Sequence, residues 1–495
     1  MNNETMIHGE GDVMVPAHLN FGRFVLDRLR RATPDHICLR NCTTGEQLTF
    51  SEFTQYAVRL GAALAQLGVG RGDTVAVGGE PRVTFMPTGL AVVLAGAAYT
   101  PIPLSCGSAT LTHKLNLTKP KYFICTRQFW EAHSTTLKSL EFINTFICFD
   151  DVEDIGLSVQ ELVSNQSHVD VDTFEPAVVN GDDMAVVLYS SGTTGMSKGV
   201  LITHLSCIAR CDAQGWYGFD SFQTAYFAGD DQCGSYGIFP VYMFWCAGKT
   251  MVYSEDDVDL KIIQDYKVDV MPTVPGFAEE LLSSKVEYDL SSLKIVYTGT
   301  APLHLTTAKA FKERYPNIEL LNIYGTTEAY LITAQGPSPI GTTTIGVATP
   351  GVTIKVVDTE TRATLGPNQR GEICVKSPFL MKGYLGATSR YLDEQGFYLT
   401  GDLGYYDEEK MFYLDGRLHD IIVHHLGYKI SPLELEEVLL SHPAVREAGV
   451  VGRPGEGESS PPPLWCCSLM LESRRPSCKT TWTQRLLGTC SSAVV

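Results

Sequence analysis

Two apolar segments frame a loop of small and hydroxyl-bearing residues that ends in a lysine, and this arrangement restricts how the middle of the chain can fold. The first segment covers residues 185–189 and the second residues 199–203, and both have the composition of buried strands. The loop between them has the sequence SSGTTGMSK. Gly192 and Gly195 permit backbone angles that other residues avoid, so consecutive N–H groups can converge on an anion, and Lys198 adds a full charge. The pattern predicts a phosphate-binding loop between two strands.

A plain hairpin turn and a Walker A motif both fit this loop less well. An ordinary Gly/Ser hairpin turn would account for the glycines, but not for nine small or polar residues that end in a lysine between apolar strands. The loop is not a Walker A motif, because its glycine and lysine are not adjacent before a Ser or Thr and because a strand-like segment follows it. The predicted phosphate-binding residues are Ser190, Ser191, Gly192, Thr193, Thr194, Gly195 and Lys198.

The first third of the chain alternates between helical and strand patterns. Thr49 and Glu52 have the spacing of a capping box, and apolar residues then recur at helical intervals. Residues 74–77 and 121–125 are short apolar strands. Residues 83–104 carry no charge, but three prolines and many small side chains favour a buried helix that runs into a strand over a membrane span. Repeated β-α-β order with apolar strands predicts an α/β fold of parallel-rich sheets flanked by helices.

The pattern changes in the C-terminal part of the chain. A small β-rich subdomain is predicted from short alternating strands over residues 346–358, 371–376 and 410–414. A second unit follows, with a strand over 420–423, a capped helix from Ser431 and a strand over 448–451. Beyond about residue 455 no helical or strand period remains, although four of the fourteen Cys and two of the five Trp fall there.

The length of 495 residues allows about two to four domain-sized units. We expect a large N-terminal domain that includes the β subdomain, then a partial α+β C-terminal domain, and finally an atypical, disordered tail that does not belong to the preceding fold. Their expected limits are residues 20–415, 416–455 and 456–495.

Charge and cysteine usage exclude several classes of function. The formal net charge of −18 comes without any basic run, which argues against general affinity for nucleic acid because phosphate neutralisation needs clustered Lys and Arg. The fourteen cysteines are scattered, and residues 1–16 are polar and acidic, unlike a secretory signal. Free thiols in a reducing compartment are expected. The sequence points to no protein partner.

Two further segments put small and hydroxyl-bearing residues after predicted strands. Residues 298–302 follow a strand over 293–296, and residues 324–328 follow a strand over 320–323. Strand ends are where ligands of open α/β sheets usually bind. Tyr324 offers a flat face to a purine, Thr327 a hydroxyl to a phosphate oxygen and Glu328 a carboxylate to Mg²⁺. Each segment alone is compatible with a simple turn, so the two segments are evidence for a ligand site only when they are taken together with the other motifs.

A fourth segment, Thr400-Gly401-Asp402, follows an aromatic strand. An aspartate held in a tight turn can accept hydrogen bonds from both hydroxyls of a ribose. An Asx-type turn without a ligand would fit the same three residues. Arg417 lies a short distance further along the chain and could reinforce contacts to the ribose or to a phosphate.

Taken together, these segments resemble the adenylate-forming superfamily, which includes acyl-CoA synthetases, 4-coumarate–CoA ligases and beetle luciferases. The motifs that carry the resemblance appear in the family's order and spacing, and they are residues 189–200, 324–328, 371–375 and 400–402. The resemblance covers about residues 20–455, and the surrounding sequence looks most like insect luciferase-like and 4-coumarate–CoA ligase-like proteins. It implies an N-terminal AMP-binding (adenylation) domain over 20–415 and part of a C-terminal AMP-binding domain over 416–455.

The resemblance implies a reaction in two steps, with ATP, Mg²⁺ and CoA as cofactor and cosubstrates. ATP and a carboxylic acid give an acyl-adenylate and pyrophosphate, and the acyl group then passes to CoA. By resemblance, the catalytic residues are Lys198 for the β- and γ-phosphates, Thr327 for the α-phosphate, Glu328 for Mg²⁺, and Arg417, which holds the ribose with Asp402. The remaining nucleotide-binding residues that it implies are Thr298, Gly299, Thr300, Ala301, Pro302, Tyr324, Gly325 and Thr326.

The sequence departs from the family pattern near its C-terminus. The lysine that the family places in a Gly-Lys context there has no counterpart, since Lys479 lies in the atypical tail. Loss of one such cation commonly costs on the order of 10²–10³ in rate, so a weakened first step is expected. Gly416 occupies the position where the family hinge usually has Asp, and Val423 lies near the sequence position where luciferases have a second lysine. The adjacent histidines at 424–425 would face opposite sides of a strand, which favours a loop tip over a metal site.

The acid pocket also departs from that of luciferases. Their histidine–aromatic pair is replaced around residues 233–236. An apolar lining from Tyr236, Leu331 and Ile332 would accept a medium or long aliphatic acid, or an aryl acid.

Three functions stay open from the sequence. The first is an acid–thiol ligase, the second a luciferase-type monooxygenase that uses ATP and oxygen, and the third a catalytically weak nucleotide- or acyl-binding homologue. The family resemblance predicts a peroxisomal location. Residues 492–495 are not a Ser-Lys-Leu-type signal, and their sequence predicts a cytoplasmic location instead.

Overall fold

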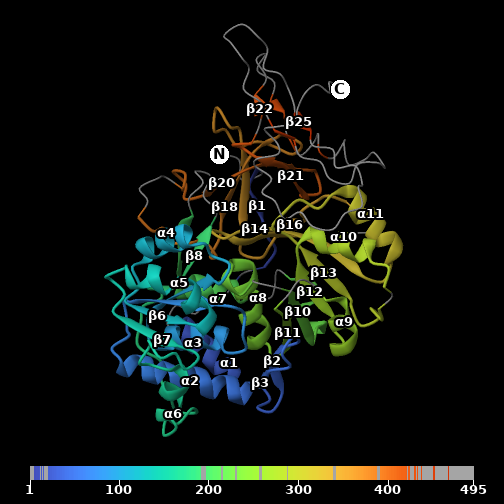
Figure 1. Cartoon of the computed structure of the whole chain (residues 1–495). Helices are drawn as coiled ribbons and strands as arrows, with labels where there is room; N and C mark the ends of the chain where they lie inside the picture. Colours follow the sequence, from blue (N-terminus) through green and yellow to red (C-terminus); the bar gives the residue numbers. More distant parts are fainter. Residues whose placement is uncertain are drawn as a thin grey trace.

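The computed structural model describes most of the chain in a few long stretches. These are residues 5–11, 13, 15, 20–190, 197–212, 216–228, 231–255, 259–286, 288–337, 342–386 and 391–420, with short pieces at 422–423, 429–430, 432, 436, 450–451 and 466–467. Three β-sheets form the framework, two of them large and covered by helices and the third smaller and lying above them in Figure 1. The predicted α/β class is confirmed.

The first large sheet has seven strands, and the predicted phosphate loop connects two of them. In spatial order they are β19 (Gly383–Tyr384), β9 (Lys198–Thr203), β8 (Met184–Ser190), β5 (Ala98–Pro103), β4 (Thr74–Gly79), β6 (Tyr122–Cys125) and β7 (Thr145–Cys148). Strands β8, β5, β4, β6 and β7 run parallel, whereas β9 returns antiparallel to β8 and pairs with β19. The strand that was predicted after the loop, in place of a helix, is therefore present.

The second large sheet has nine strands with a parallel centre and antiparallel edges. Its order is β16 (Val347–Ala348), β15 (Tyr330–Ala334), β14 (Glu319–Thr326), β13 (Ile295–Thr298), β12 (Val270–Thr273), β10 (Thr224–Ala228), β11 (Thr250–Ser254), β2 (Ile37–Asn41) and β3 (Gln47–Thr49). The turn from parallel to antiparallel pairing occurs at β14, which pairs with β13 on one side and with β15 on the other.

Helices pack between and around these two sheets (Figure 1). They are α1 (Phe21–Leu29), α2 (Phe50–Gln66), α3 (Phe85–Leu94), α4 (Ser108–Thr118), α5 (Arg127–Lys138), α6 (Val159–Asn165), α7 (His204–Arg210), α8 (Ser235–Cys246), α9 (Leu260–Tyr266), α10 (Pro275–Ser283) and α11 (Leu305–Arg314), with short 3₁₀ turns η2 (Phe219–Ser221) and η3 (Asp231–Cys233). Helix α1 contacts α3 and α7, which pack on the seven-stranded sheet, and α8, which packs on the nine-stranded sheet. It therefore joins the helices of the two large sheets. The Thr49–Glu52 capping box is present at the start of α2.

The charge-free segment at residues 83–104 forms the buried helix α3 followed by strand β5, as predicted. All ten residues of α3 are buried. Within the described residues, none of the helices combines the length and apolar character that a membrane crossing requires.

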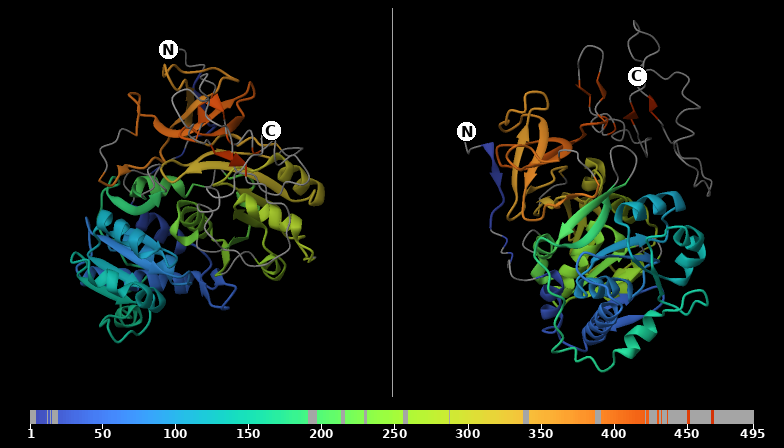
Figure 2. Two further views of the ribbon diagram at one scale, coloured as in Figure 1. Left: turned by 45° about the horizontal axis from the view of Figure 1, so that its top comes forward. Right: turned by 90° about the vertical axis from the view of Figure 1, so that its left-hand side faces the viewer.

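The third sheet is the small β subdomain, and it is antiparallel throughout (Figure 2). Its strands are β1 (Ile7–His8), β17 (Thr353–Val357), β18 (Gly371–Lys376), β20 (Tyr398–Tyr406) and β21 (Phe412–Arg417). Strand β1 comes from the N-terminus, ahead of the expected domain start at residue 20. Strand β21 continues two residues beyond the expected boundary at residue 415, because Gly416 and Arg417 still pair with β20.

Few residues beyond 420 are described. Strand β22 (Ile422–Val423) pairs with β23 (Lys429–Ile430), and β24 (Val450–Val451) pairs with β25 (Cys466–Cys467). The predicted strands over 420–423 and 448–451 are thus present in shorter form, and β25 lies in the tail where no strand was expected. The histidines at 424–425 and most of the tail lie outside the described residues. So does the helix predicted from Ser431, except for Pro432 and Glu436, which are both helical.

Candidate active site

A cavity of about 680 Å³ lies where the three sheets meet, and residues from all of them line it. A second cavity, of about 730 Å³, adjoins it and shares its lining at Thr300, Ile323, Gly325 and Arg417. Both sizes are within the range of ligand pockets in proteins. The described residues of the four predicted segments lie in or beside these two cavities, with the exceptions given below.

The Tyr324–Glu328 segment forms a tight hairpin between β14 and β15. The prediction that strand β14 ends at Ile323 is wrong by three residues, because the antiparallel partner β15 continues the hydrogen-bonded ladder to Thr326. Thr327 and Glu328 occupy the loop of the hairpin. Gly325 has no room for a side chain, since a Cβ there would lie 2.1 Å from the carbonyl oxygen of Tyr330. Glycine therefore permits the close approach of the two strands on which this loop is built.

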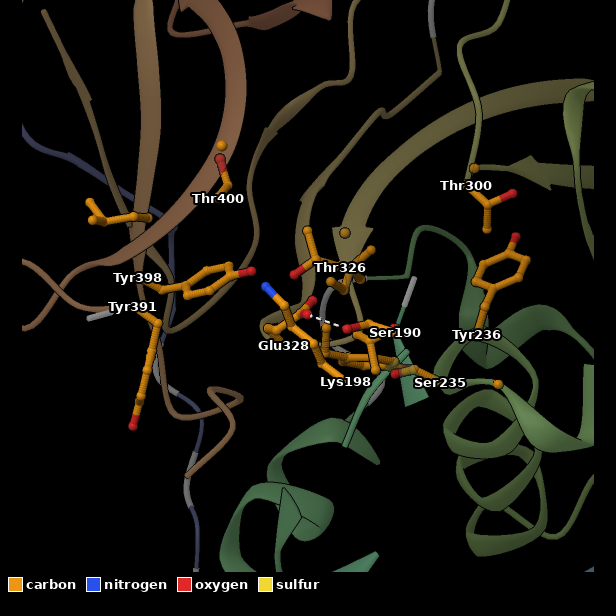
Figure 3. Close-up of a pocket in the computed structure, with 18 of the residues that line it drawn as sticks. Ser190, Lys198, Ser235, Tyr236, Thr300, Thr326, Glu328, Tyr391, Tyr398 and Thr400 are labelled. Carbon is orange, nitrogen blue, oxygen red and sulfur yellow. Dashed lines mark hydrogen bonds between the residues drawn. The ribbon is translucent and has the colours of Figure 1, made fainter. Parts of the chain in front are cut away.

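Glu328 is held in place by hydroxyl groups from the seven-stranded sheet. Ser190 Oγ donates to Glu328 Oε1 at 2.7 Å, and the hydroxyl of Tyr384 donates to the same oxygen at 2.8 Å. Lys198 Nζ lies 5.0 Å from the centre of the Tyr384 ring. In Figure 3 the carboxylate of Glu328 is flanked by Ser190 and Lys198, between Tyr398 and Thr400 on one side and Tyr236 and Thr300 on the other. Ser190, at the start of the phosphate loop, thus hydrogen-bonds to the carboxylate that we predict to bind metal, and Lys198, at the end of the loop, lies beside it.

The Glu328 carboxylate fits the requirements of a magnesium ligand. Mg²⁺ takes oxygen ligands and is commonly held by one or two carboxylates, with waters and substrate phosphates completing its shell. Over the described part of the chain, no group of three or more His, Cys, Asp or Glu side chains is arranged as a metal cage. A site of one carboxylate next to a phosphate loop is therefore the kind of magnesium site that this cavity can form.

Helix α4 supports the phosphate loop from outside the cavity. Nε2 of His113 lies 2.7 Å from the carbonyl oxygen of Ser197, directly before Lys198. Tyr189 at the other end of the loop donates its hydroxyl to the carbonyl oxygen of Lys114 at 3.2 Å. Helix α4 therefore holds both ends of the loop. Ser191, Gly192, Thr193, Thr194 and Gly195 lie outside the described residues.

Asp402 is buried and has two partners. The Tyr324 hydroxyl donates to Asp402 Oδ2 at 2.6 Å, and Nε of Arg417 lies 2.8 Å from Oδ1. Burial raises the pKa of Asp402, while Arg417 and the Tyr324 hydroxyl act in the opposite direction. Asp402 and Arg417 are direct partners across β20 and β21. This pair lines the second cavity together with Tyr324, which belongs to the β14–β15 hairpin.

The prediction of a tight turn at Thr400-Gly401-Asp402 is wrong. The three residues lie inside β20, which pairs with β18 and β21. Gly401 has φ +71°, which only bends the strand locally, and the amide of Asp402 donates to Thr400 Oγ1 at 3.0 Å. The turn-like composition at this point marks a bend within a strand.

The segment at residues 298–302 contributes most of its members to the cavities. Thr300 lines both cavities, Gly299 lines the first, and Ala301 and Pro302 line the second. Thr298 is fully buried in β13 and lines neither of them. Tyr324, Gly325 and Asp402 complete the wall of the second cavity, whereas Thr326 and Thr327 line the first.

Arg210 is a site residue that the sequence reasoning missed. It is fully buried at the end of α7, and burial lowers its pKa to about 10, so it stays charged at neutral pH. Its guanidinium donates to the carbonyl oxygens of Thr327 at 3.1 Å, Glu328 at 3.3 Å and Phe379 at 2.7 Å. The one Arg or Lys in the short helix His204–Arg210, all but one of whose residues are buried, is the signal that could have revealed it.

Comparison with known proteins identifies the family. The profile described as AMP-binding enzyme matches residues 26–385, more than half of the chain. This chain belongs to the AMP-binding enzyme family.

Relatives of this AMP-binding enzyme include both luciferases and CoA ligases. Luciferin 4-monooxygenase of Photuris pensylvanica is 32% identical over 447 residues, which cover 86% of this chain and 81% of the relative. 4-Coumarate–CoA ligase 1 of Petroselinum crispum is 31% identical over 461 residues, covering 89% and 83%. Peroxisomal OPC-8:0-CoA ligase 1 of Arabidopsis thaliana is 30% identical over 433 residues, covering 84% and 79%.

Solved structures agree with this assignment. ATP-bound MatB from Rhodopseudomonas palustris superposes with a TM-score of 0.78 at 25% identity, covering 88% of this chain and 86% of MatB. The luciferase-like enzyme of the nonluminescent mealworm Zophobas morio has a TM-score of 0.77 at 23% identity, covering 83% and 99%, and shares the fold. The chain is therefore an adenylate-forming enzyme by family, and its relatives carry out both ligase and luciferase reactions.

Two of the three predicted acid-pocket residues of this AMP-binding enzyme lie in the first cavity. Tyr236 and Leu331 line it, whereas Ile332 is fully buried and lines neither cavity. Leu331 and Ile332 are consecutive in β15, so their side chains point to opposite faces of the sheet. Tyr330, at the start of the strand with φ +60°, does not follow this alternation. Tyr330 and Trp216, which the sequence reasoning did not select, line the same end of the cavity.

Proposed function

We propose that this protein activates a carboxylic acid with ATP and transfers the acyl group to the thiol of CoA. The observation that carries the proposal is the position of Glu328 between Ser190 and Tyr384, beside Lys198 and in a cavity that continues to Asp402 and Arg417. This arrangement provides an anion-binding loop, a metal-binding carboxylate and a ribose-binding carboxylate in one continuous space. An adenylate-forming reaction requires these three components together.

In the first step a carboxylate oxygen of the acid attacks the α-phosphorus of ATP. The bond from that phosphorus to the bridging oxygen breaks, and pyrophosphate leaves with the bonding electrons. An anion that attacks an anion needs charge neutralisation and alignment. We assign Lys198 and the loop to the β- and γ-phosphates and Thr327 to the α-phosphate. Glu328 would hold Mg²⁺, which when bound neutralises phosphate charge.

In the second step the CoA sulfur attacks the acyl carbon, the bond to the phosphate oxygen breaks, and AMP leaves while the thiol proton is lost to solvent. Asp402 and Arg417 are assigned to the ribose, and the adenine is assigned to the second cavity, whose wall includes Ala301, Pro302 and Tyr324. The relatives that are named as CoA ligases support the choice of CoA as acceptor.

A luciferase-type reaction is the second candidate, because luciferin 4-monooxygenases of similar identity are among the relatives. Such an enzyme would form a luciferyl adenylate and then oxidise it with oxygen. The first step and its residues are common to both reactions, so the acceptor of the second step distinguishes them. A peroxisomal or a cytoplasmic location stays a prediction for either.

The test is to measure pyrophosphate release from ATP with a panel of carboxylic acids, with and without CoA, and to follow light emission with luciferin. We expect acid-dependent pyrophosphate release and CoA-dependent thioester formation. Lys198→Met is expected to abolish most of the release, whereas Lys382→Met, which removes an exposed lysine outside both cavities, serves as the matched control. Adenosine binding without pyrophosphate release for any acid would refute the proposal, and light emission would favour the second candidate.

A further inference from the structure

Tyr330 follows directly after the Thr327–Ala329 loop and has an unusual backbone conformation. Its φ is +60°, and its partner across the hairpin is Thr326. A short hairpin loop often ends in a left-handed residue, a conformation that glycine adopts freely and that is sterically costly for a residue with a side chain. A strained residue beside a ligand cavity is a reason to ask what its side chain does there.

The Tyr330 ring is buried and fixed by its neighbours. It packs edge-to-face on Phe239, with ring centres 5.6 Å apart, and on Phe379, with centres 6.1 Å apart. The guanidinium carbon of Arg210 lies 5.6 Å from its centre. Burial raises the pKa of the Tyr330 phenol, which therefore stays neutral at physiological pH. The ring cannot turn aside without breaking these aromatic and cation–π contacts.

Tyr330 also lies between two hollow spaces. Together with Leu331 it lines the 680 Å³ cavity, and the same two residues line a small cavity of about 10 Å³ whose other walls include Val13, Asp212 and Phe379. The Tyr330–Leu331 pair is therefore a partition, with the candidate active site on one side and a nearly filled space on the other.

The other walls at this end of the cavity are rigid as well. The Tyr236 hydroxyl donates to the carbonyl oxygens of Thr273 at 3.2 Å and Tyr297 at 3.3 Å. Trp216 packs edge-to-face on Tyr297, with ring centres 4.6 Å apart. Figure 3 shows Tyr236 on the side of the cavity away from Tyr398 and Thr400. Tyr236, on the side of the cavity away from Tyr398 and Thr400, and Trp216 are thus anchored rings in the cavity wall.

We propose that Tyr330 closes the acid end of the active-site cavity and limits the substrate to short or compact carboxylic acids. The inference rests on the proposed function in taking this cavity as the acid site. A long acyl chain that enters beside Thr327 would have to continue through the space that the Tyr330 ring occupies. Long-chain fatty acids are therefore excluded, and the strained tyrosine is the residue that determines the size limit.

The experiment compares wild type, Tyr330→Gly and Tyr330→Phe for binding of straight-chain acids from butanoic to hexadecanoic acid by calorimetry. Glycine removes the ring and suits the positive φ, whereas phenylalanine keeps the ring and is the matched control. We expect wild type and Y330F to bind butanoic acid but no acid beyond medium length. In Y330G the ratio of decanoic to butanoic acid affinity should rise at least tenfold, since each extra methylene in an apolar pocket changes affinity by about tenfold or more.

Three results would overturn the inference: an unchanged affinity ratio in Y330G, equal binding of butanoic and hexadecanoic acid by wild type, or no binding of any acid. Should Y330G fail to fold by circular dichroism, Tyr330→Ser takes its place with the same expectation. Pyrophosphate release is measured in parallel with the same acids. A shifted size limit without pyrophosphate release would refute the proposed function and support the role of Tyr330, and release with an unshifted limit would do the reverse.

Discussion

The hydrogen bond from Tyr324 to Asp402 makes a quantitative prediction about nucleotide binding. Tyr324→Phe removes only the hydroxyl that donates to Asp402 Oδ2 at 2.6 Å. A hydrogen bond to a charged group contributes about 1.5–3 kcal/mol, and one pKa unit corresponds to 1.36 kcal/mol. Because this hydroxyl favours the ionised carboxylate, its loss should raise the pKa of Asp402 further above its ordinary value.

Adenosine is the suitable probe because it carries both ribose hydroxyls and no phosphate that titrates in the same range. Protonated Asp402 loses its charge and part of its acceptor capacity, so adenosine should bind less tightly as pH falls through the pKa of Asp402. Calorimetric titrations over a pH series should place the midpoint of this loss at a higher pH in Y324F than in wild type. Dideoxyadenosine, which lacks both hydroxyls, should show no such midpoint in either protein.

The hydrogen bond between Tyr324 and Asp402 also determines the direction in which stability changes with pH. The folded-state pKa of Asp402 is raised, so the stability that this group contributes is present below its unfolded pKa and is lost as pH rises through the folded value. The stability difference between wild type and Y324F should therefore be largest at high pH. Tyr406 lies in the same strand as Asp402, and its hydroxyl donates to the carbonyl oxygen of Leu365. Tyr406→Phe removes that hydroxyl and serves as the control. An unchanged midpoint in Y324F, or an equal shift in Y406F, would refute this account of Asp402.

Three further predictions concern the hairpin loop and its supports. Glu328→Gln should lower pyrophosphate release on the order of 10²–10³-fold and weaken its dependence on Mg²⁺ concentration, while adenosine binding stays near the wild-type value. A variant with normal magnesium dependence would contradict the assignment of Glu328 as the Mg²⁺ ligand. His113→Ala should raise KM for ATP because the Ser197 carbonyl loses its hydrogen-bond partner. His113→Gln keeps an N–H donor and should return KM to the wild-type value. Equal KM values in all three proteins would exclude this positioning role. Arg210→Met should lower the free energy of unfolding by about 1–3 kcal/mol, because the half-buried Thr327 carbonyl loses its donor. Thermal denaturation that matches wild type would contradict this.

The parts of the site that depend on local sequence were predictable. The strand–loop–strand unit around Lys198 and the capping box at Thr49 are set by neighbours within a few residues, and the structure has both. Strand alternation also predicts that Leu331 and Ile332 face opposite sides. That rule excludes one of the two from the predicted acid pocket, and only the structure shows that the excluded residue is Ile332.

The parts that depend on distant segments were not predictable from one sequence. The bend at Gly401 resembles a turn in composition, and only the pairing of the flanking residues of β20 with β18 and β21 makes it part of a strand. Tyr384 meets Glu328 only because β19 docks on β9 at the edge of the seven-stranded sheet. Arg210 acts through backbone carbonyls, which leave no trace in the sequence of the residues that it holds.

The β14–β15 hairpin places the phosphate chemistry and the acid-size limit within four residues, yet separate contacts hold each of them. Arg210 fixes the loop from behind through the Thr327 and Glu328 carbonyls. The Glu328 carboxylate is held by Ser190 and Tyr384, which belong to the other large sheet. The Tyr330 ring instead packs on Phe239, Phe379 and Arg210. Arg210 contacts both the loop carbonyls and the Tyr330 ring, whereas the Glu328 carboxylate and that ring have different side-chain partners. Because energetic coupling is small between side chains that share no partners, a change of ring at Tyr330 that leaves Arg210 in place should alter which acid enters without moving the carboxylate that serves the phosphates.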